Sequence, residues 1–184
     1  MISFKASYIK PITITNKSQR DFPVKEEVAL VKLDSSSLAD LEAVDSTSSH
    51  WGYYETYAHD IKSTMSKEYY LPGVRKNSQK EFFAATLQKE NFQNLDSKKI
   101  IGLMQIDQTN PSACKLDFIQ VSPELMNNSK ISNFKNIGKA MIEGLKRLTQ
   151  KNIELNSIGS AGEFYKKLGF EKIKDSTTYV FRRI

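Results

Sequence analysis

The sequence predicts a single mixed α/β domain built around one central sheet. Its 184 residues suit one domain with a sizeable core, and its 39% hydrophobic and 26% charged residues are ordinary for a globular protein. Strand-like and helix-like patterns follow one another in the order β-α-α-β-β-β-α-β-α-β-β. No repeat or linker interrupts this order, so we expect one domain at residues 26–184 behind an N-terminal arm at residues 1–25.

The N-terminal arm is predicted to be less regular than the strand that follows it. Residues 1–25 are mostly polar, and Pro11 and Pro23 flank a short alternation, "ITIT". Proline is confined to sheet edges, so we expect an irregular arm with room for one edge strand. The next segment, "EEVALVKLD" at residues 26–34, is a predicted strand.

Two helices are predicted next. Serines 35–37 offer N-cap side chains for a helix through Leu38, Leu41 and Val44. The second helix has apolar residues at i, i+3, i+4, i+7 and i+11, which form one helical face. These residues are Tyr54, Tyr57, Ala58, Ile61 and Met65, and we expect both tyrosines to be core residues. The segment "LPGVRKNSQ" then breaks the pattern.

Three strand-like segments form the middle of the chain. They are "EFFAATLQKE", "KKIIGLMQID" and "CKLDFIQVSPE", and polar turn material such as "TNPSA" separates them. Because the connections are short, we expect these strands to form an antiparallel meander.

The C-terminal part contains the strongest predicted helix. Its apolar stripe comprises Ile137, Ala140, Met141, Gly144, Leu145 and Leu148. Glu143 and Arg147 are four residues apart on its polar side and are expected to pair. A strand "IELNSI", a helix ending at Gly169 and a closing hairpin, "EKIKD" with "TYVFRRI", complete the chain.

Composition limits the classes of function. The 27 basic and 21 acidic residues give a net charge of +6, which favours an anionic cofactor, an acidic protein or RNA. The lysines are scattered, which disfavours nucleic acid without excluding it. One cysteine, Cys114, and two histidines are too few for a structural zinc site, so we expect no metal. The lone cysteine and the absence of an apolar leader or span predict a cytoplasmic protein.

Three stretches together resemble the GNAT-type N-acetyltransferases. They read "VSPEL", "NFKNIGKAMIEGL" and "SAGEFYKKLGF", in the order that this family has them. The resemblance implies a GNAT-like fold, with a mostly antiparallel sheet, about four flanking helices and a V-shaped splay between the strands at residues 114–121 and 153–158. It also implies acetyl-CoA as cosubstrate and an amine-bearing acceptor. Many relatives dimerise, which leaves a homodimer open.

The resemblance assigns the residues that would bind acetyl-CoA. A loop and helix start, where backbone N–H groups and the helix dipole meet an anion, would hold the pyrophosphate. Asn133 and Asn136 depart from the family's pattern, but asparagine tolerates positive φ, so Asn136 can stand in for a glycine. Asn156 lies two residues before Ile158, where the family often has asparagine. The implied cofactor residues are Ile119, Gln120, Val121, Asn133, Phe134, Lys135, Asn136, Ile137, Gly138, Lys139, Ala140, Asn156 and Tyr165.

The resemblance also implies the chemistry. Tyr165 matches the tyrosine that protonates the departing CoA thiolate. A protonated amine must lose a proton before it attacks, so a base helps. Asp117 is the first candidate, because strand alternation predicts that it shares a sheet face with Ile119 and Val121. Glu55 and His50 are weaker candidates.

The acceptor is expected to meet the aromatic segment between the first two helices. Trp51 and Tyr53 could line its site or contact an amine by cation–π attraction, with Glu55 close by. Nothing in the sequence names the acceptor. Two alternatives stay open: a GNAT-like regulatory module that binds CoA weakly, and an acetyltransferase acting on aminoacyl-tRNA.

Overall fold

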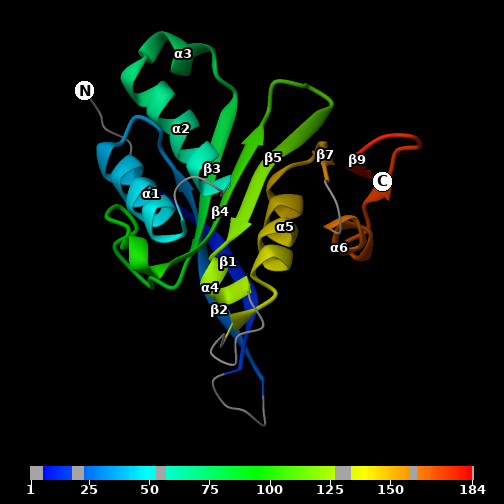
Figure 1. The fold of residues 1–184 in the computed structure, drawn as a ribbon, viewed down its shortest axis with the longest axis horizontal. Helices are drawn as coiled ribbons and strands as arrows, with labels where there is room; N and C mark the ends of the chain where they lie inside the picture. Colours follow the sequence, from blue (N-terminus) through cyan, green and yellow to red (C-terminus); the bar gives the residue numbers. More distant parts are fainter. Residues whose placement is uncertain (1–5, 18–22, 53–56, 127–133, 158–160, 184) are drawn as a thin grey trace.

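The computed structural model describes residues 6–17, 23–52, 57–126, 134–157 and 161–183. The described strands join one mixed sheet in the order β6-β1-β2-β3-β4-β5-β7-β9-β8 (Figure 1). The strands are β1 (Ser7–Asn16), β2 (Val24–Leu33), β3 (Lys80–Thr86), β4 (Ile100–Asp107), β5 (Ala113–Val121), β6 (Phe134–Lys135), β7 (Asn152–Asn156), β8 (Glu171–Lys172) and β9 (Thr178–Phe181). The helices are α1 (Leu38–His50), α2 (Tyr57–Tyr70), α3 (Pro72–Asn77), η1 (Ser97–Lys99), α4 (Pro123–Met126), α5 (Ile137–Leu148) and α6 (Gly162–Lys167).

Two hydrophobic clusters cover the two faces of the sheet. Helices α1 and α2 lie on one face, where Val44 and Ile61 are buried against strand residues such as Leu103. Helix α5 lies on the other face, where Met141 and Leu145 are buried. The prediction of a mixed α/β domain with helices flanking one sheet is therefore confirmed (Figure 1).

The N-terminal segment contains the strand that the prediction allowed for, and it is more regular than expected. The strand β1 lies near the edge of the sheet and pairs antiparallel with β2 from Ser7 to Asn16. Ile12 and Ile14 of β1 are buried in the cluster under α5. Pro11 is tolerated because β1 has its second neighbour, β6, only at Thr15 and Asn16. Pairing with β2 along the strand and the burial of Ile12 and Ile14 outweigh the one hydrogen bond that proline cannot donate.

Most other elements follow the sequence prediction. The meander β3-β4-β5 and the helices α1, α2 and α5 form where their apolar patterns indicate. The segment "LPGVRKNSQ", expected only to break the pattern, contains the short helix α3, with Pro72 at its start, where a proline costs no hydrogen bond. Glu143 pairs with Lys146 at 2.9 Å and not with Arg147 as expected.

Asp40 is a buried carboxylate that closes the turn between β2 and α1. Its side chain is buried, and its Oδ2 accepts a 2.8 Å hydrogen bond from the backbone N–H of Asp34. The backbone N–H of Asp40 donates to the N-cap Ser37 hydroxyl at 3.3 Å. Burial raises the pKa of Asp40 to about 6, because removal from water disfavours the charged form.

This raised pKa predicts a specific dependence of stability on pH. The folded chain holds the Asp40 proton more tightly than the unfolded chain, so the free energy of unfolding should fall by roughly 2 kcal/mol as pH rises from about 4 to 7. Asp40→Asn should remove this fall while keeping an acceptor for Asp34. Urea unfolding at pH 4, 5, 6 and 7 measures it, with the exposed Asp60→Asn as control. An unchanged pH profile in Asp40→Asn would contradict the assignment.

Candidate functional site

The sheet opens between β5 and β7. The two strands pair in parallel only from Ala113 to Leu116 of β5, and β7 ends at Asn156. Beyond Leu116, β5 continues to pair with β4 on its other side as far as Val121. The predicted splay between these two strands is therefore present in the fold.

The backbone of β5 presents donors to this opening. The N–H of Ser122 donates to the carbonyl of Ile101 on β4 at 3.1 Å. In an antiparallel pair, successive residues direct their N–H groups alternately toward and away from the partner strand. The N–H groups of Ile119 and Val121 therefore point away from β4, toward the side where β7 has diverged.

A β-bulge changes the face on which Asp117 lies. Gln105 of β4 is opposite Phe118 and Ile106 is opposite Leu116, so Asp117 is the extra residue. Phe118 packs with the α2-side cluster, whereas Val121 packs with the α5-side cluster. Strand alternation fails at the bulge, and the predicted shared face is wrong.

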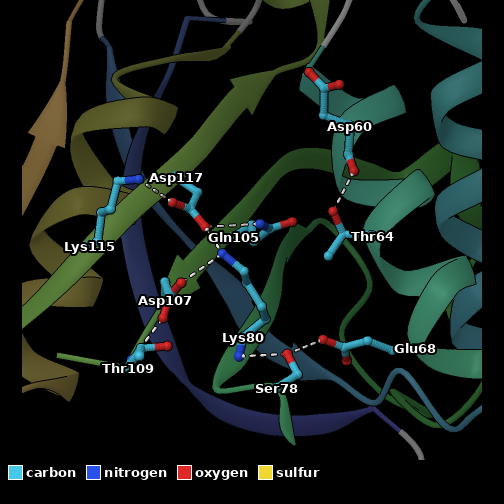
Figure 2. A network of polar contacts seen from close by, with 10 residues as sticks. All are labelled: Asp60, Thr64, Glu68, Ser78, Lys80, Gln105, Asp107, Thr109, Lys115 and Asp117. Carbon is cyan, nitrogen blue, oxygen red and sulfur yellow. Dashed lines mark hydrogen bonds and ion pairs between the residues drawn. The ribbon is translucent and has the colours of Figure 1, made fainter. Parts of the chain in front are cut away.

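The contacts of Asp117 identify its face. Its Oδ2 accepts hydrogen bonds from Lys80 Nζ at 2.6 Å and Gln105 Nε2 at 3.1 Å (Figure 2). Lys80 alternates along β3 with Phe82 and Ala84, which both belong to the α2-side cluster. Asp117 therefore lies on the α2 face and not on the face of Ile119 and Val121.

Asp117 is already occupied by cationic partners. Besides Lys80, the Lys115 ammonium lies 3.2 Å from the Oδ1 of Asp117 (Figure 2). The Asp117 side chain is 7% exposed. Lys80 also bonds Asp107 at 2.8 Å. Burial alone would raise the pKa of Asp107, but hydrogen bonds from Lys80 and Thr109 outweigh burial and lower it to about 2. An amine proton would have to compete with these donors, so the role of Asp117 as base stays a prediction that its contacts do not favour.

The start of α5 has the geometry expected of an anion-binding turn. Asn136 is its N-cap and has φ 64° and ψ 20°, which confirms that asparagine takes the left-handed conformation here. Its carbonyl accepts the first helical bond from Ala140 at 2.9 Å, while its side chain donates to Thr15 Oγ1 at 3.1 Å. The Asn136 side chain does not cap the helix. The next N–H groups have no intrahelical carbonyl and lie at the positive end of the helix dipole.

Gly138 marks where three elements meet. A Cβ atom built there would lie 3.6 Å from Val121 Cγ2 of β5 and 3.7 Å from Phe164 Cζ of α6. The helix start is therefore adjacent to the open end of β5 and to the helix that carries Tyr165. Lys135 and Lys139 are both exposed beside it and add positive charge.

Helix α6 ends in a Schellman motif that explains the "FYKKLGF" stretch. Gly169 has φ +81°, and its N–H donates to the carbonyl of Lys166 at 2.9 Å. The N–H of Phe170 donates to the carbonyl of Tyr165 at 3.1 Å. The rings of Phe170 and Tyr165 lie 5.8 Å apart, which is the apolar contact typical of this motif. The predicted glycine stop is confirmed, and it orients Tyr165.

Tyr165 is half-buried among aromatic rings. Phe164 and Tyr179 lie 5.1 and 6.2 Å from its ring, centroid to centroid. Burial raises the pKa of Tyr165 above its usual 10, and the nearby Tyr57 adds to the rise. The phenol therefore keeps its proton at neutral pH and can donate it.

Tyr57 is a candidate site residue that the sequence interpretation placed elsewhere. It was expected in the core, but it begins α2, is 48% exposed, and lies 5.5 Å from the Phe118 ring. Gln120, one of the implied cofactor residues, also holds this helix start, because its Oε1 accepts a hydrogen bond from the N–H of Ala58 at 3.2 Å. Tyr57 precedes the aliphatic residues of the amphipathic pattern, and this place near the start of the predicted helix was the available signal.

Other predicted residues have their own contacts. Trp51, expected to line the acceptor site, is buried in the α2-side cluster. His50 is exposed and 3.4 Å from Glu124. The Oδ1 of Asn156 accepts from the Thr178 hydroxyl at 2.9 Å. Tyr53, Glu55, Asn133, Tyr54 and Ile158 lie outside the described residues.

Cys114 is placed as a packing residue. It is fully buried, and burial raises its pKa to about 12. A thiol in this state does not supply a thiolate nucleophile at neutral pH. Cys114 therefore serves the packing of the α5-side cluster.

The fold was compared with known proteins. A protein from Desulfovibrio desulfuricans, described as a GNAT-family acetyltransferase, matches with a TM-score of 0.53 and 16% identity over 84% of this chain and 98% of its own. A protein from Exiguobacterium sp. 255-15, described as an acetyltransferase, matches with a TM-score of 0.52 and 16% identity over 85% and 93%. The chain has the GNAT acetyltransferase fold. No family model matches its sequence, and no curated protein does.

The Schellman motif gives a testable prediction about α6. Gly169→Ala places a Cβ on a residue with φ +81°, which should lower the free energy of unfolding by about 1 kcal/mol. Urea denaturation measures this change. Gly73→Ala is the matched control, because Gly73 lies in helix α3 with open space around its Cβ position and should be neutral or stabilising. Equal stability of both variants would argue against the motif.

Proposed function

We propose that the protein is an acetyl-CoA-dependent N-acetyltransferase. The observation that carries the proposal is the convergence of three features at Gly138: the open end of β5, the left-handed start of α5, and the helix of Tyr165. Each feature has a separate use in acetyl transfer. The GNAT fold alone is compatible with the reaction but does not specify it.

The cosubstrate would be held by backbone groups and the helix end. The N–H groups from Ile137 to Lys139 lie at the positive end of α5, where they would bind the pyrophosphate of acetyl-CoA. Lys135 and Lys139 add charge there. The free N–H groups of Ile119 and Val121 suit the pantetheine arm and the thioester carbonyl, where they would polarise the carbonyl and stabilise the developing oxyanion.

The reaction would be a direct transfer. The acceptor nitrogen attacks the thioester carbonyl carbon, a C–N bond forms, and the C–S bond breaks. The neutral nitrogen passes one proton to a base or to a water relay, and the departing CoA thiolate gains one from the Tyr165 phenol. The resulting phenolate is later reprotonated from solvent. The raised pKa of Tyr165 keeps that proton available across neutral pH.

The acceptor and the base remain open within this proposal. Tyr57 and Phe118 present an aromatic surface on the α2 side of β5, where an amine can approach the thioester. Asp117, His50 and Glu55 remain candidate bases, and a water relay serves the same purpose. The net charge of +6 keeps an aminoacyl-tRNA acceptor as the second candidate.

A cytoplasmic location is part of the proposal. Within the described part of the chain, no helix has the length and apolar character to cross a bilayer. The single cysteine is buried, which fits a reducing cytoplasm. A homodimer would leave the proposed chemistry unchanged.

The first test is calorimetric titration with acetyl-CoA and free CoA. We expect micromolar binding, and Asn136→Gly should keep it because glycine adopts positive φ without strain. Asn136→Val should weaken it about tenfold or more, since a β-branched residue at φ 64° is strained. Asn91→Val is the matched control, because Asn91 has φ 55° in a loop far from α5 in the sequence. No binding at millimolar acetyl-CoA would overturn the enzyme proposal in favour of a GNAT-like interaction module.

The second test addresses Tyr165. Tyr165→Phe removes the phenolic proton but keeps the ring, so turnover should fall about a hundredfold while acetyl-CoA affinity changes less than about threefold. Acetyl transfer across a panel of amines, followed by thiol release, measures turnover. Tyr70→Phe, at an exposed tyrosine on α2, should leave turnover unchanged. Equal turnover of Tyr165→Phe and wild type would remove the phenol from the chemistry.

A further inference from the structure

Lys146 is a buried lysine with several partners. It lies in the last turn of α5 and is 8% exposed. Its Nζ donates to the Leu168 carbonyl at 2.5 Å and to Glu143 Oε1 at 2.9 Å. Burying an ammonium is costly unless it is paired and hydrogen-bonded, so this side chain has a fixed position.

Two aromatic rings complete the enclosure. The Nζ lies 4.3 Å from the centroid of Phe181 on β9 and 5.6 Å from that of Phe170. At these distances a cation is attracted by the face of a ring. The ammonium of α5 thus joins the end of α6 to the C-terminal hairpin.

The contact with Leu168 connects Lys146 to the phenol of Tyr165. Leu168 is the C-cap of α6, where free carbonyls form the negative end of the helix and favour a cation. Phe170, which lies beneath Lys146, donates its N–H to the Tyr165 carbonyl and packs on the Tyr165 ring. Any shift of the α6 end would therefore move Tyr165.

We propose that Lys146 is a positioning residue that holds the C-terminal end of α6, and so sets the place of the Tyr165 phenol relative to the open end of β5. This inference rests on the proposed acetyl transfer. It gives α5 two tasks: its first turn would bind the cosubstrate, and its last turn fixes the helix of the acid. Because one rigid helix carries both contacts, it keeps the cosubstrate site and the helix of Tyr165 at a constant separation.

Kinetics separate positioning from mere stability. Lys146→Met keeps most of the stem but removes the ammonium, and kcat should fall between about fivefold and a hundredfold while KM for acetyl-CoA stays within about twofold. Lys146→Arg, which retains a cation, should recover part of kcat. Arg147→Met is the matched control: it removes an exposed charge from the same turn and should leave kcat unchanged. Glu143→Gln removes the ion pair but leaves the Leu168 contact, and should also keep kcat.

Hydrogen exchange gives a readout that needs no turnover. The N–H groups of Gly169 and Phe170 make the Schellman bonds, and they should exchange at least about tenfold faster in Lys146→Met than in Arg147→Met. A wild-type protein that is inactive and binds no acetyl-CoA would overturn the proposed function. Hydrogen exchange would then still test whether Lys146 stabilises the C-terminal end of α6. An active wild type with equal kcat and equal exchange in Lys146→Met and Arg147→Met would overturn the positioning role. A rise in KM with unchanged kcat would overturn it too.

Discussion

The early end of the parallel pairing between β5 and β7 is the constraint on which the site depends. Four residues of each strand pair, and among the described residues β5 then continues with β4 as its strand neighbour. This frees the N–H groups of Ile119 and Val121 without exposing an unsupported strand, because the β4 ladder holds β5 in place. The bulge at Asp117 next to this point directs the ionic network to the α2 face, so the two faces of β5 have different chemistry (Figure 2).

Helix α5 begins beside this opening, with Gly138 close to Val121 of β5. It approaches the sheet closely, because a Cβ at Gly144 would lie 3.0 Å from Leu30 and 3.2 Å from Ile12. The strand β1 supports its start through pairing with β6 and through the Thr15–Asn136 hydrogen bond. The N-terminal segment is therefore part of the site's framework, which gives the strained residue at φ 64° the surrounding support that such a conformation needs.

The helix of Tyr165 is held from three directions. Gly162 allows the Tyr179 hydroxyl to approach its backbone so closely that no Cβ would fit. The Schellman bonds close its C-terminal end, and Lys146 reaches that end from α5. A helix of six residues has little stability of its own, so tertiary contacts and not propensity decide where the phenol lies.

The sequence by itself determined the meander β3-β4-β5, the helices α1, α2 and α5, the glycine stop after α6 and the positive φ at Asn136. Periodic apolar residues and turn-specific residues specify such features locally. Only the tertiary structure decided the place of β1, the face of Asp117 and the exposure of Tyr57. The strand β1 contains a proline and is stabilised by pairing with β2. The bulge at Asp117 depends on the register of β5 with β4. The start of α2 depends on a hydrogen bond to Gln120 of β5. These are pairings between segments far apart in the chain, and no local pattern encodes them.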